Sequence, residues 1–229
     1  HPKVAKTLVL DKKYPSLIKK SRELGHFDVF FSFRSSFRSK FLKLLISANN
    51  KHQFSKTKYQ NRHQVEKYNN FVNESLGTNF PAGKLVIFQH SEFNINNSSL
   101  PLLGINPGSS KRWYPQEFAQ VAAKLSSDYD IVIFGSPDEE DIAKDIEKSL
   151  IEKGVTNYQN LVGKTTIVEL INQISSLDLF ITGDSGPMHV AAASQVPTVA
   201  IFGSTRDDET SQWMNEKSVI VKKTLDCQP

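Results

Sequence analysis

Residues 179–203, LFITGDSGPMHVAAASQVPTVAIFG, decide the fold class of this chain. Two short apolar runs, 179–182 and 199–202, have the length and composition of buried strands. Between them lie a polar loop, 183–186, and an alanine-rich stretch, 187–194, that predicts a short helix. A strand, a helix and a second strand in this order are typical of a parallel βαβ unit.

The same alternation extends back to about residue 100. Apolar runs predict strands at 102–106 and 131–134, and each is followed by apolar residues at helical spacing. Thr166 and Glu169 have the spacing of a capping box and mark the start of a further helix. We therefore expect an α/β fold with a doubly wound parallel sheet over residues 100–229.

The first part of the chain is less regular, although a buried strand at 28–33 and helices at 36–46 and 63–76 are predicted. The polar run 94–99, NINNSS, predicts a linker. We therefore expect two domains, residues 1–93 and residues 100–229.

Charge is distributed unevenly between the two parts. Residues 1–99 contain 17 Lys and Arg against 6 Asp and Glu, a net charge of +11, whereas residues 100–229 contain 11 against 18, a net charge of −7. A basic first part and an acidic second part indicate different partners, or a cleft between unlike surfaces. Solvated lysine-rich helices would give the same composition.

Several classes of protein are disfavoured. The single cysteine, Cys227, cannot form an intrachain disulfide, so a cytoplasmic location is expected. No run of about 18 apolar residues and no signal-peptide pattern occurs, which disfavours a membrane span or export. No Gly-x-Gly-x-x-Gly follows a predicted strand, which disfavours a Rossmann oxidoreductase. Strand-like stretches at 4–10 and 218–222 lead us to expect a fragment of a longer protein.

Three predicted strands end in loops where glycine lies beside polar or charged residues. In open α/β sheets, ligands bind beyond the carboxyl ends of the strands, so we expect these loops to converge. The first loop, residues 107–113, places two hydroxyl groups and two cations directly before a helix. Free N–H groups, the helix dipole and Lys111 would favour a phosphate there. An ordinary turn with solvated cations would have the same sequence.

The second loop, residues 183–186, brings a carboxylate to a strand end and glycine N–H groups to a helix start. The carboxylate of Asp184 would repel phosphate, so it suits sugar hydroxyls better, whereas Ser185 and the amides around Gly186 suit phosphate groups. His189, beside apolar neighbours, is more typical of a structural histidine than of a catalyst.

The third loop, residues 135–140, contains Asp138 and Glu139. Either residue could bind a ribose, because a carboxylate accepts two hydroxyl hydrogen bonds in one plane. Acidic residues in a first helical turn are also good capping residues, and both interpretations stay open.

Residues 183–193, GDSGPMHVAAA, closely resemble the signature of glycosyltransferase family 9. Three further segments have the order and spacing that the family shows, so the resemblance covers about residues 100–229; they are KRW at 111–113, IFGS at 133–136 and FGST at 202–205. Within the family, KRW and the ending CQP at 227–229 resemble heptosyltransferase II more than heptosyltransferase I.

The resemblance implies the GT-B architecture, two Rossmann-like domains facing across a cleft, with the first domain incomplete here. It implies an inverting transfer from ADP-heptose without a metal or other cofactor, and Lys111 stabilising the leaving diphosphate. Residue by residue, it assigns the diphosphate to Ser109, Ser110 and Lys111, the heptose to Asp184, the nucleoside to Glu139 or Asp138, and the rest of the donor to Ser185, Gly186, Met188 and His189.

In the first part, residues 36–39 and 63–67 resemble two family segments, Phe-Lys-Ser and His-x-Val-Glu-Arg. The resemblance implies transfer of L-glycero-D-manno-heptose to the inner-core heptose or Kdo–lipid A acceptor of lipopolysaccharide. It also implies peripheral contact with the cytoplasmic face of the inner membrane and no nucleic-acid partner. The residues expected to bind the anionic acceptor are Arg34, Arg38, Lys40 and His63.

The sequence departs from the family pattern in two places. The family opens with a strand and a Gly-Asp pair whose Asp would be the general base, and this chain does not contain that opening segment, so no catalytic base is assigned. Family members also have more residues between Pro-Gly-Ser and Lys-Arg-Trp. Two alternatives stay open: a nucleotide-sugar epimerase of the same fold, against which the basic first part argues, and an inert nucleotide- or glycan-binding module.

Overall fold

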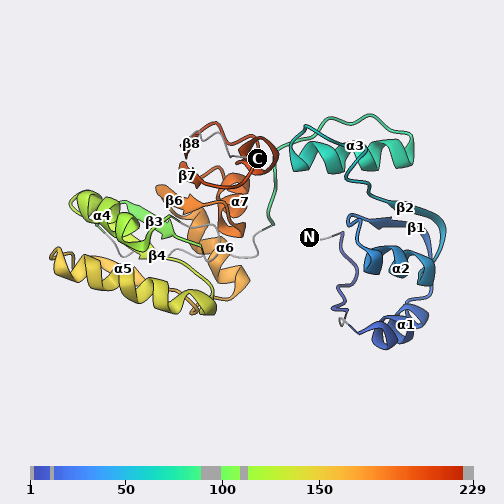
Figure 1. The fold of residues 1–229 in the computed structure, drawn as a ribbon, viewed down its shortest axis with the longest axis horizontal. Coiled ribbons are helices and arrows are strands. Elements are labelled where there is room, and N and C mark those ends of the chain that lie inside the picture. Colours follow the sequence, from blue (N-terminus) through green and yellow to red (C-terminus); the bar gives the residue numbers. More distant parts are fainter. Residues whose placement is uncertain (1–2, 11–12, 89–98, 109–112, 224–229) are drawn as a thin grey trace. The chain divides into compact units, whose positions relative to one another are not determined.

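The computed structural model describes residues 3–10, 13–88, 99–108 and 113–223 (Figure 1). The chain forms two compact units, residues 1–82 and residues 83–229. In the described part of the chain, no helix is long and apolar enough to cross a membrane.

The second unit is built on a six-stranded sheet in which all neighbouring strands are parallel. Its strands are β3 (Leu102–Asn106), β4 (Asp130–Ile133), β5 (Tyr158–Asn160), β6 (Leu179–Gly183), β7 (Thr198–Phe202) and β8 (Ser218–Lys222). The helices that follow are α4 (Pro115–Leu125), the 3₁₀ turn η1 (Pro137–Glu139), α5 (Glu140–Glu152), α6 (Ile167–Ser175), α7 (Gly186–Ala193) and α8 (Asp207–Thr210). The doubly wound α/β fold class is therefore confirmed.

The strand order is β5-β4-β3-β6-β7-β8. From β3 the chain moves outward to β4 and β5, then returns to β6 on the other side of β3. This is the order of the dinucleotide-binding fold, and its topological switch point lies between β3 and β6. A ligand is therefore expected beyond the carboxyl ends of these two strands.

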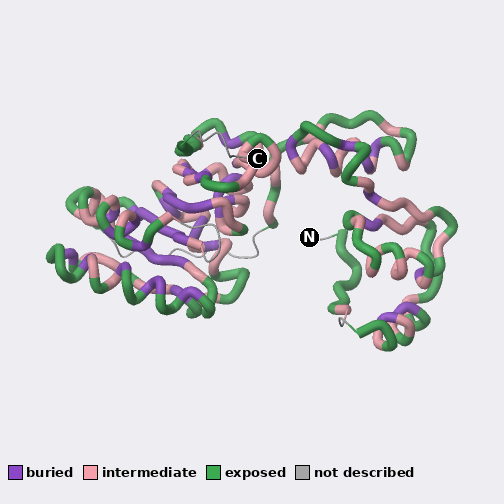
Figure 2. Tube along the Cα trace, viewed as in Figure 1, coloured by how far each residue is buried: buried purple, intermediate pink, exposed green. Residues whose placement is uncertain are grey.

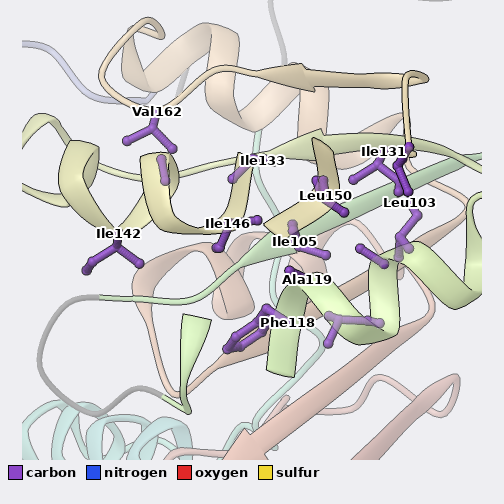
Figure 3. Packing of buried hydrophobic residues seen from close by; sticks show 14 residues of the cluster. Leu103, Ile105, Phe118, Ala119, Ile131, Ile133, Ile142, Ile146, Leu150 and Val162 are labelled. Carbon is purple, nitrogen blue, oxygen red and sulfur yellow. The ribbon is translucent and has the colours of Figure 1, made fainter. Parts of the chain in front are cut away.

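Both faces of the sheet are buried, as crossover helices require. On one face, Leu103 and Ile105 of β3 pack with α4 and α5, and Figure 3 shows them beside Phe118, Ala119 and Ile146. The opposite face is covered by α6 and α7 and contains a second cluster, whose buried members include Leu102, Val132, Phe134, Ile174, Phe180 and Ala191. Buried residues accordingly follow the strands of this unit in Figure 2.

Strand β5 and helix α8 were not predicted from the sequence. β5 has only three residues, Tyr-Gln-Asn, and lies at the edge of the sheet beside β4. A polar edge strand of this length has no apolar run or alternation to detect. The remaining strands and the helices α4 to α7 were predicted.

The first unit contains a parallel pair of strands, β1 (His26–Ser32) and β2 (Ser47–Gln53). Its helices are α1 (Tyr14–Glu23), α2 (Phe37–Leu45) and α3 (Gln64–Leu76). An aromatic cluster joins α3 to the strands, with Phe71 packed edge-on against Phe54 and Phe31 at ring-centroid distances of 5.7 and 5.9 Å. The predicted strand at 28–33 and the two predicted helices are present within two residues, whereas α1 and β2 were not predicted. The expectation that this strand is buried was wrong, since only Ser32 of β1 is buried, and the strand-like stretch at 4–10 forms no strand.

Along the chain, the boundary between the two compact units falls between Ala82 and Gly83, before the linker predicted at 94–99. Gly83 is held in the second unit because its carbonyl accepts a hydrogen bond from Trp213 Nε1 at 2.9 Å. Lys84 follows it, donating to Gln195 Oε1 at 3.2 Å. Except for Ser99, the predicted linker lies outside the described residues.

Candidate functional site

A cavity of about 470 Å³ lies at the carboxyl ends of the strands around the switch point. Four loops line it, following β3, β4, β5 and β6. The three loops that the sequence analysis expected to converge therefore do so, joined by the loop after β5. The lining residues are Asn106, Pro107 and Gly108; Gly135, Ser136, Pro137 and Glu139; Gly163, Thr165, Ile167 and Leu170; and Gly183, Asp184, Ser185, Gly186 and Pro187.

Asn106, the last residue of β3, connects three strand ends beneath this cavity. Its side chain is 2% exposed, and Nδ2 donates to the carbonyl of Phe134 at 2.9 Å. On its other side, Oδ1 accepts from Ser185 Oγ at 3.2 Å and from Thr182 Oγ1 at 3.4 Å. These bonds hold the loops after β4 and β6 in fixed positions relative to β3.

The amino-terminal end of α7 faces the cavity, since Gly186 and Pro187 belong to its wall. Ser185 occupies the N-cap position with an extended backbone, but its side chain caps no N–H group of α7 among the described residues. The first N–H groups of a helix have no intrahelical acceptor, so this end can bind an anion. Asp184 precedes it and places a carboxylate in the same wall.

Glu139 lies in the third of the loops expected from the sequence, after β4, and is only 7% exposed. Its Oε2 accepts a hydrogen bond from the backbone N–H of Ser136 at 2.6 Å. In the described part of the chain, Oε1 has no hydrogen-bond partner, although Glu139 lines the cavity. The residue can therefore act both as a capping residue and as an acceptor for a ligand, the two interpretations that the sequence left open.

An apolar part of the wall comes from the start of α6. Ile167 and Leu170 line the cavity, and Ile167 is 77% exposed. Thr166 caps this helix, accepting from Glu169 N at 3.3 Å, and the carboxylate of Glu169 accepts from Thr166 N at 2.7 Å. The capping box thus fixes an exposed isoleucine at the edge of a polar cavity, where it could pack against a flat apolar ligand surface.

The model of glycosyltransferase family 9 (heptosyltransferase) matches residues 29–229. This chain belongs to glycosyltransferase family 9. It is therefore a glycosyltransferase, with the GT-B fold class of that family, and the resemblance on which the sequence analysis relied is confirmed.

Known relatives agree with the family assignment. The lipooligosaccharide heptosyltransferase 2 of Campylobacter jejuni serotype O:2 is 39% identical over 225 residues, which cover 95% of this chain and 70% of the relative. The family 9 glycosyl transferase of Veillonella parvula has a similar fold, with a TM-score of 0.80, 23% identity and coverage of 94% of this chain and 70% of that one. The ADP-heptose lps heptosyltransferase II of E. coli has a TM-score of 0.71 at 21% identity, covering 90% of this chain and 71% of that one.

The donor residues expected in this glycosyltransferase fall into three groups: those that line the cavity, those outside its wall and those outside the described residues. Glu139, Asp184, Ser185 and Gly186 line the cavity. Asp138 is exposed and lies outside the described cavity wall, so Glu139 is the better placed of the two carboxylates.

Met188 and His189 also lie away from the described cavity wall. Met188 is fully buried and packs with Ala200 and Phe202, so only its backbone could serve the donor. His189 is half-buried on α7. Ser109, Ser110 and Lys111, expected at the diphosphate, lie outside the described residues.

Five residues of the cavity wall were missed in the sequence analysis. Asn106 is an ordinary strand-end residue in sequence, and its importance comes from contacts with residues far along the chain. Ile167 and Leu170 belong to α6, a helix that was predicted but not expected at the site. Gly163 and Thr165 belong to the loop after β5, which was missed because β5 itself was missed. A detected strand before residue 161 would have identified this loop as a fourth one at the same sheet edge.

In the first unit, three of the four residues expected at the acceptor are accessible. Arg34 and Lys40 are exposed and Arg38 is half-buried, at or near the start of α2. His63 is different: it is 8% exposed, and its Nδ1 accepts from Val65 N at 3.2 Å as the N-cap of α3. This capping contact provides a structural role for His63, and its role toward the acceptor stays a prediction.

A hollow of about 340 Å³ in the same unit is lined by Lys43, Lys51 and Lys58 together with Glu74. Glu74 Oε2 accepts hydrogen bonds from Lys58 Nζ and from Tyr59 OH, the latter at 2.6 Å. These bonds, first the one from Lys58, lower the pKa of Glu74. The lining contains one carboxylate residue and three lysines, so its formal net charge is positive.

No group of three or more His, Cys, Asp and Glu residues within the described ranges could hold a metal ion.

Proposed function

We propose that this chain transfers L-glycero-D-manno-heptose from ADP-heptose to the inner-core heptose or Kdo–lipid A acceptor in the assembly of the lipopolysaccharide core. The observation that carries the proposal is the cavity at the switch point, whose wall includes the Gly-Asp-Ser-Gly loop of the family signature. Its support from known proteins is the 39% identity to a lipooligosaccharide heptosyltransferase 2.

The cavity offers a separate group for each part of an ADP-sugar. The free Oε1 of Glu139 suits the ribose hydroxyls, and Ile167 with Leu170 suits a face of the adenine ring. The first N–H groups of α7 suit the diphosphate, because they carry the positive end of the helix dipole. Asp184 then binds hydroxyl groups of the heptose. Ser109, Ser110 and Lys111, which precede α4 in the sequence, would also bind the diphosphate.

The proposed reaction is a single displacement that inverts the anomeric centre. A hydroxyl oxygen of the acceptor forms a bond to the anomeric carbon of the donor, and the bond from that carbon to the diphosphate oxygen breaks. The hydroxyl proton passes to a general base that no residue of this chain is assigned to supply. Negative charge develops on the departing ADP, where the N–H groups of α7 and Lys111 stabilise it without a metal.

The acceptor is proposed to bind the first unit. Arg34, Arg38 and Lys40 lie at or near the start of α2, and the hollow lined by Lys43 and Lys51 adds positive charge to the same unit. Phosphates and acidic sugars of the lipopolysaccharide core would bind such a surface. The proposed location is the cytoplasmic face of the inner membrane, where the lipid acceptor is accessible through peripheral contact.

Calorimetry with ADP, UDP, GDP and ADP-heptose tests the donor. We expect binding of ADP in preference to the other two nucleotides. In Asp184→Ala, binding of ADP-heptose should weaken while binding of ADP is retained, whereas the exposed control Asp145→Ala should change neither. Preference for UDP would instead favour an epimerase or another transferase, and absence of nucleotide binding would contradict the proposal.

Lys111 is tested by turnover in the intact enzyme. Lys111→Ala should lower kcat more than it raises KM for the donor, because a leaving-group cation acts mainly in the transition state. Lys124→Ala, which removes a charge from the last turn of α4, is the matched control. Unchanged kcat in Lys111→Ala would remove this residue from the mechanism.

A further inference from the structure

We propose that Asn106 is a positioning residue: it holds the hydroxyl of Ser185 away from the amino-terminal end of α7 and so keeps the first N–H groups of that helix open for the diphosphate. The inference rests on the proposed function, because it concerns the same donor site. It goes further by identifying what prevents the helix from being capped by its own side chain.

Ser185 stands where a serine ordinarily caps a helix. An N-cap serine accepts a hydrogen bond from the N–H of the second or third helical residue. In α7 the second helical residue is Pro187, which has no N–H, so the available donor is Met188. A capped Met188 N–H could not bind an oxygen of the diphosphate.

Two other helices of this chain have a hydroxyl N-cap that makes the usual capping bond, and in one of them the hydroxyl of Thr166 also donates to Glu169 Oε2 of its own helix at 2.8 Å. Thr166 caps α6 by accepting from Glu169 N at 3.3 Å, and Ser36 caps α2 by accepting from Ser39 N at 3.3 Å. Ser185 has the extended backbone expected of an N-cap, with φ −148° and ψ 167°, yet among the described residues its side chain makes no capping bond. Its residue type therefore does not explain the difference.

Ser185 differs from these two caps in its backbone, with φ −148° against −70° and −66°, and in a hydroxyl that donates outside its own helix, to Asn106. Ser185 Oγ lies 3.2 Å from Asn106 Oδ1 and 3.1 Å from Thr182 Oγ1. The amide of Asn106 is oriented by the bond from its Nδ2 to the carbonyl of Phe134, which leaves Oδ1 directed at Ser185 and Thr182. Because Asn106 is buried, this orientation does not compete with water, and the serine hydroxyl is held on the β3 side of the loop.

The inference predicts that the part of Asn106's effect that concerns the diphosphate acts through Ser185. Removing the Asn106 side chain frees the serine hydroxyl to cap Met188 N–H, and the cap then competes with the diphosphate. If Ser185 is alanine, no hydroxyl can cap, so loss of Asn106 should have little further effect. This coupling distinguishes a positioning role from a general loss of packing.

The test is a double-mutant cycle, with ADP and adenosine binding measured by calorimetry on Asn106→Ala, Ser185→Ala and the double variant. We expect Asn106→Ala to weaken ADP binding about fivefold, the size of a typical capping contribution. Adenosine, which lacks the diphosphate, should bind with unchanged affinity. In the Ser185→Ala background, Asn106→Ala should change ADP affinity by less than about twofold.

An equal loss of ADP affinity in both serine and alanine backgrounds would overturn the inference, as would an equal loss of adenosine affinity. If Asn106→Ala does not fold, the same cycle with Asn106→Leu, which keeps the volume but makes no hydrogen bond, provides the test. A wild-type protein that binds no ADP would contradict the proposed function. One that binds ADP without the coupling would contradict only the role of Asn106.

Discussion

The carboxylate of Glu139 accepts a hydrogen bond from the backbone N–H of Ser136 at 2.6 Å, and Glu139 lines the cavity beyond the end of β4. We expect Glu139→Gln to weaken ADP binding about tenfold, since a hydrogen bond to a charged group contributes roughly 1.5–3 kcal/mol. Asp138→Asn, one residue earlier and exposed, should leave binding within about twofold of the wild type. Calorimetry measures both, and equal effects of the two variants would contradict the role of Glu139.

Gly135 provides the space in which the Glu139 carboxylate lies. A Cβ at residue 135 would be 2.9 Å from Glu139 Oε2 and 3.2 Å from both methyl carbons of Val162. Gly135→Ala should therefore displace the carboxylate and weaken ADP binding severalfold, with little loss of stability because the end of a glutamate side chain can move. The control is Gly203→Ala, where a Cβ would meet nothing within 4 Å. Unchanged ADP binding in Gly135→Ala would show that the carboxylate position is not critical.

Ile167 allows a separate test of the base-binding wall. The side chain is 77% exposed, so Ile167→Ser should alter the free energy of unfolding by less than about 0.5 kcal/mol. It should weaken binding of both ADP and adenosine by about threefold to tenfold, because the apolar contact is with the base. Val168→Ser is the matched control, since Val168 is 56% exposed but lies outside the described cavity wall. The same loss in both variants would contradict a specific contact with Ile167.

Gly104 in β3 is required by the packing of the second unit. A Cβ there would be 2.3 Å from Leu177 Cδ1 and 2.8 Å from Phe180 Cδ2, both in buried side chains. Gly104→Ala should lower the free energy of unfolding by about 1–3 kcal/mol, the range for overpacked cores. Urea denaturation measures the change, with Gly203→Ala as the control. Wild-type stability in Gly104→Ala would mean that these side chains repack without cost.

Glu74 predicts a pH dependence of stability in the first unit. Because Lys58 and Tyr59 lower the pKa of Glu74, its ionised form is favoured in the folded state. The resulting stabilisation is present above the unfolded-state pKa and is lost as the pH falls through the folded-state pKa. The stability advantage of the wild type over Glu74→Gln should therefore shrink on acidification. Denaturation at several acidic pH values measures it, and a constant difference between the proteins would contradict the prediction.

Much of the second unit was predictable because its determinants are local. Apolar runs alternate with segments whose apolar residues recur at helical spacing, because both faces of a parallel sheet are buried under helices. Thr166 and Glu169 form the expected capping box. Strand β5 was missed because its three residues, Tyr158–Asn160, carry no hydrophobic pattern, and with it the loop containing Gly163 and Thr165 was missed as part of the site.

By itself, the sequence determined the doubly wound fold class, the family and the loops at the strand ends, because spacing, apolar runs and the Gly-Asp-Ser-Gly motif are properties of neighbouring residues. Only the tertiary structure decided which of those residues act together. Asn106 and Ser185 are 79 residues apart, and no local pattern indicates that they share a hydrogen bond. Likewise, only the structure shows that Met188 is a buried core residue and that Glu139, not Asp138, lines the cavity. Such pairings arise when parallel strands bring distant loops to one edge of a sheet, so they depend on the register of the folded chain.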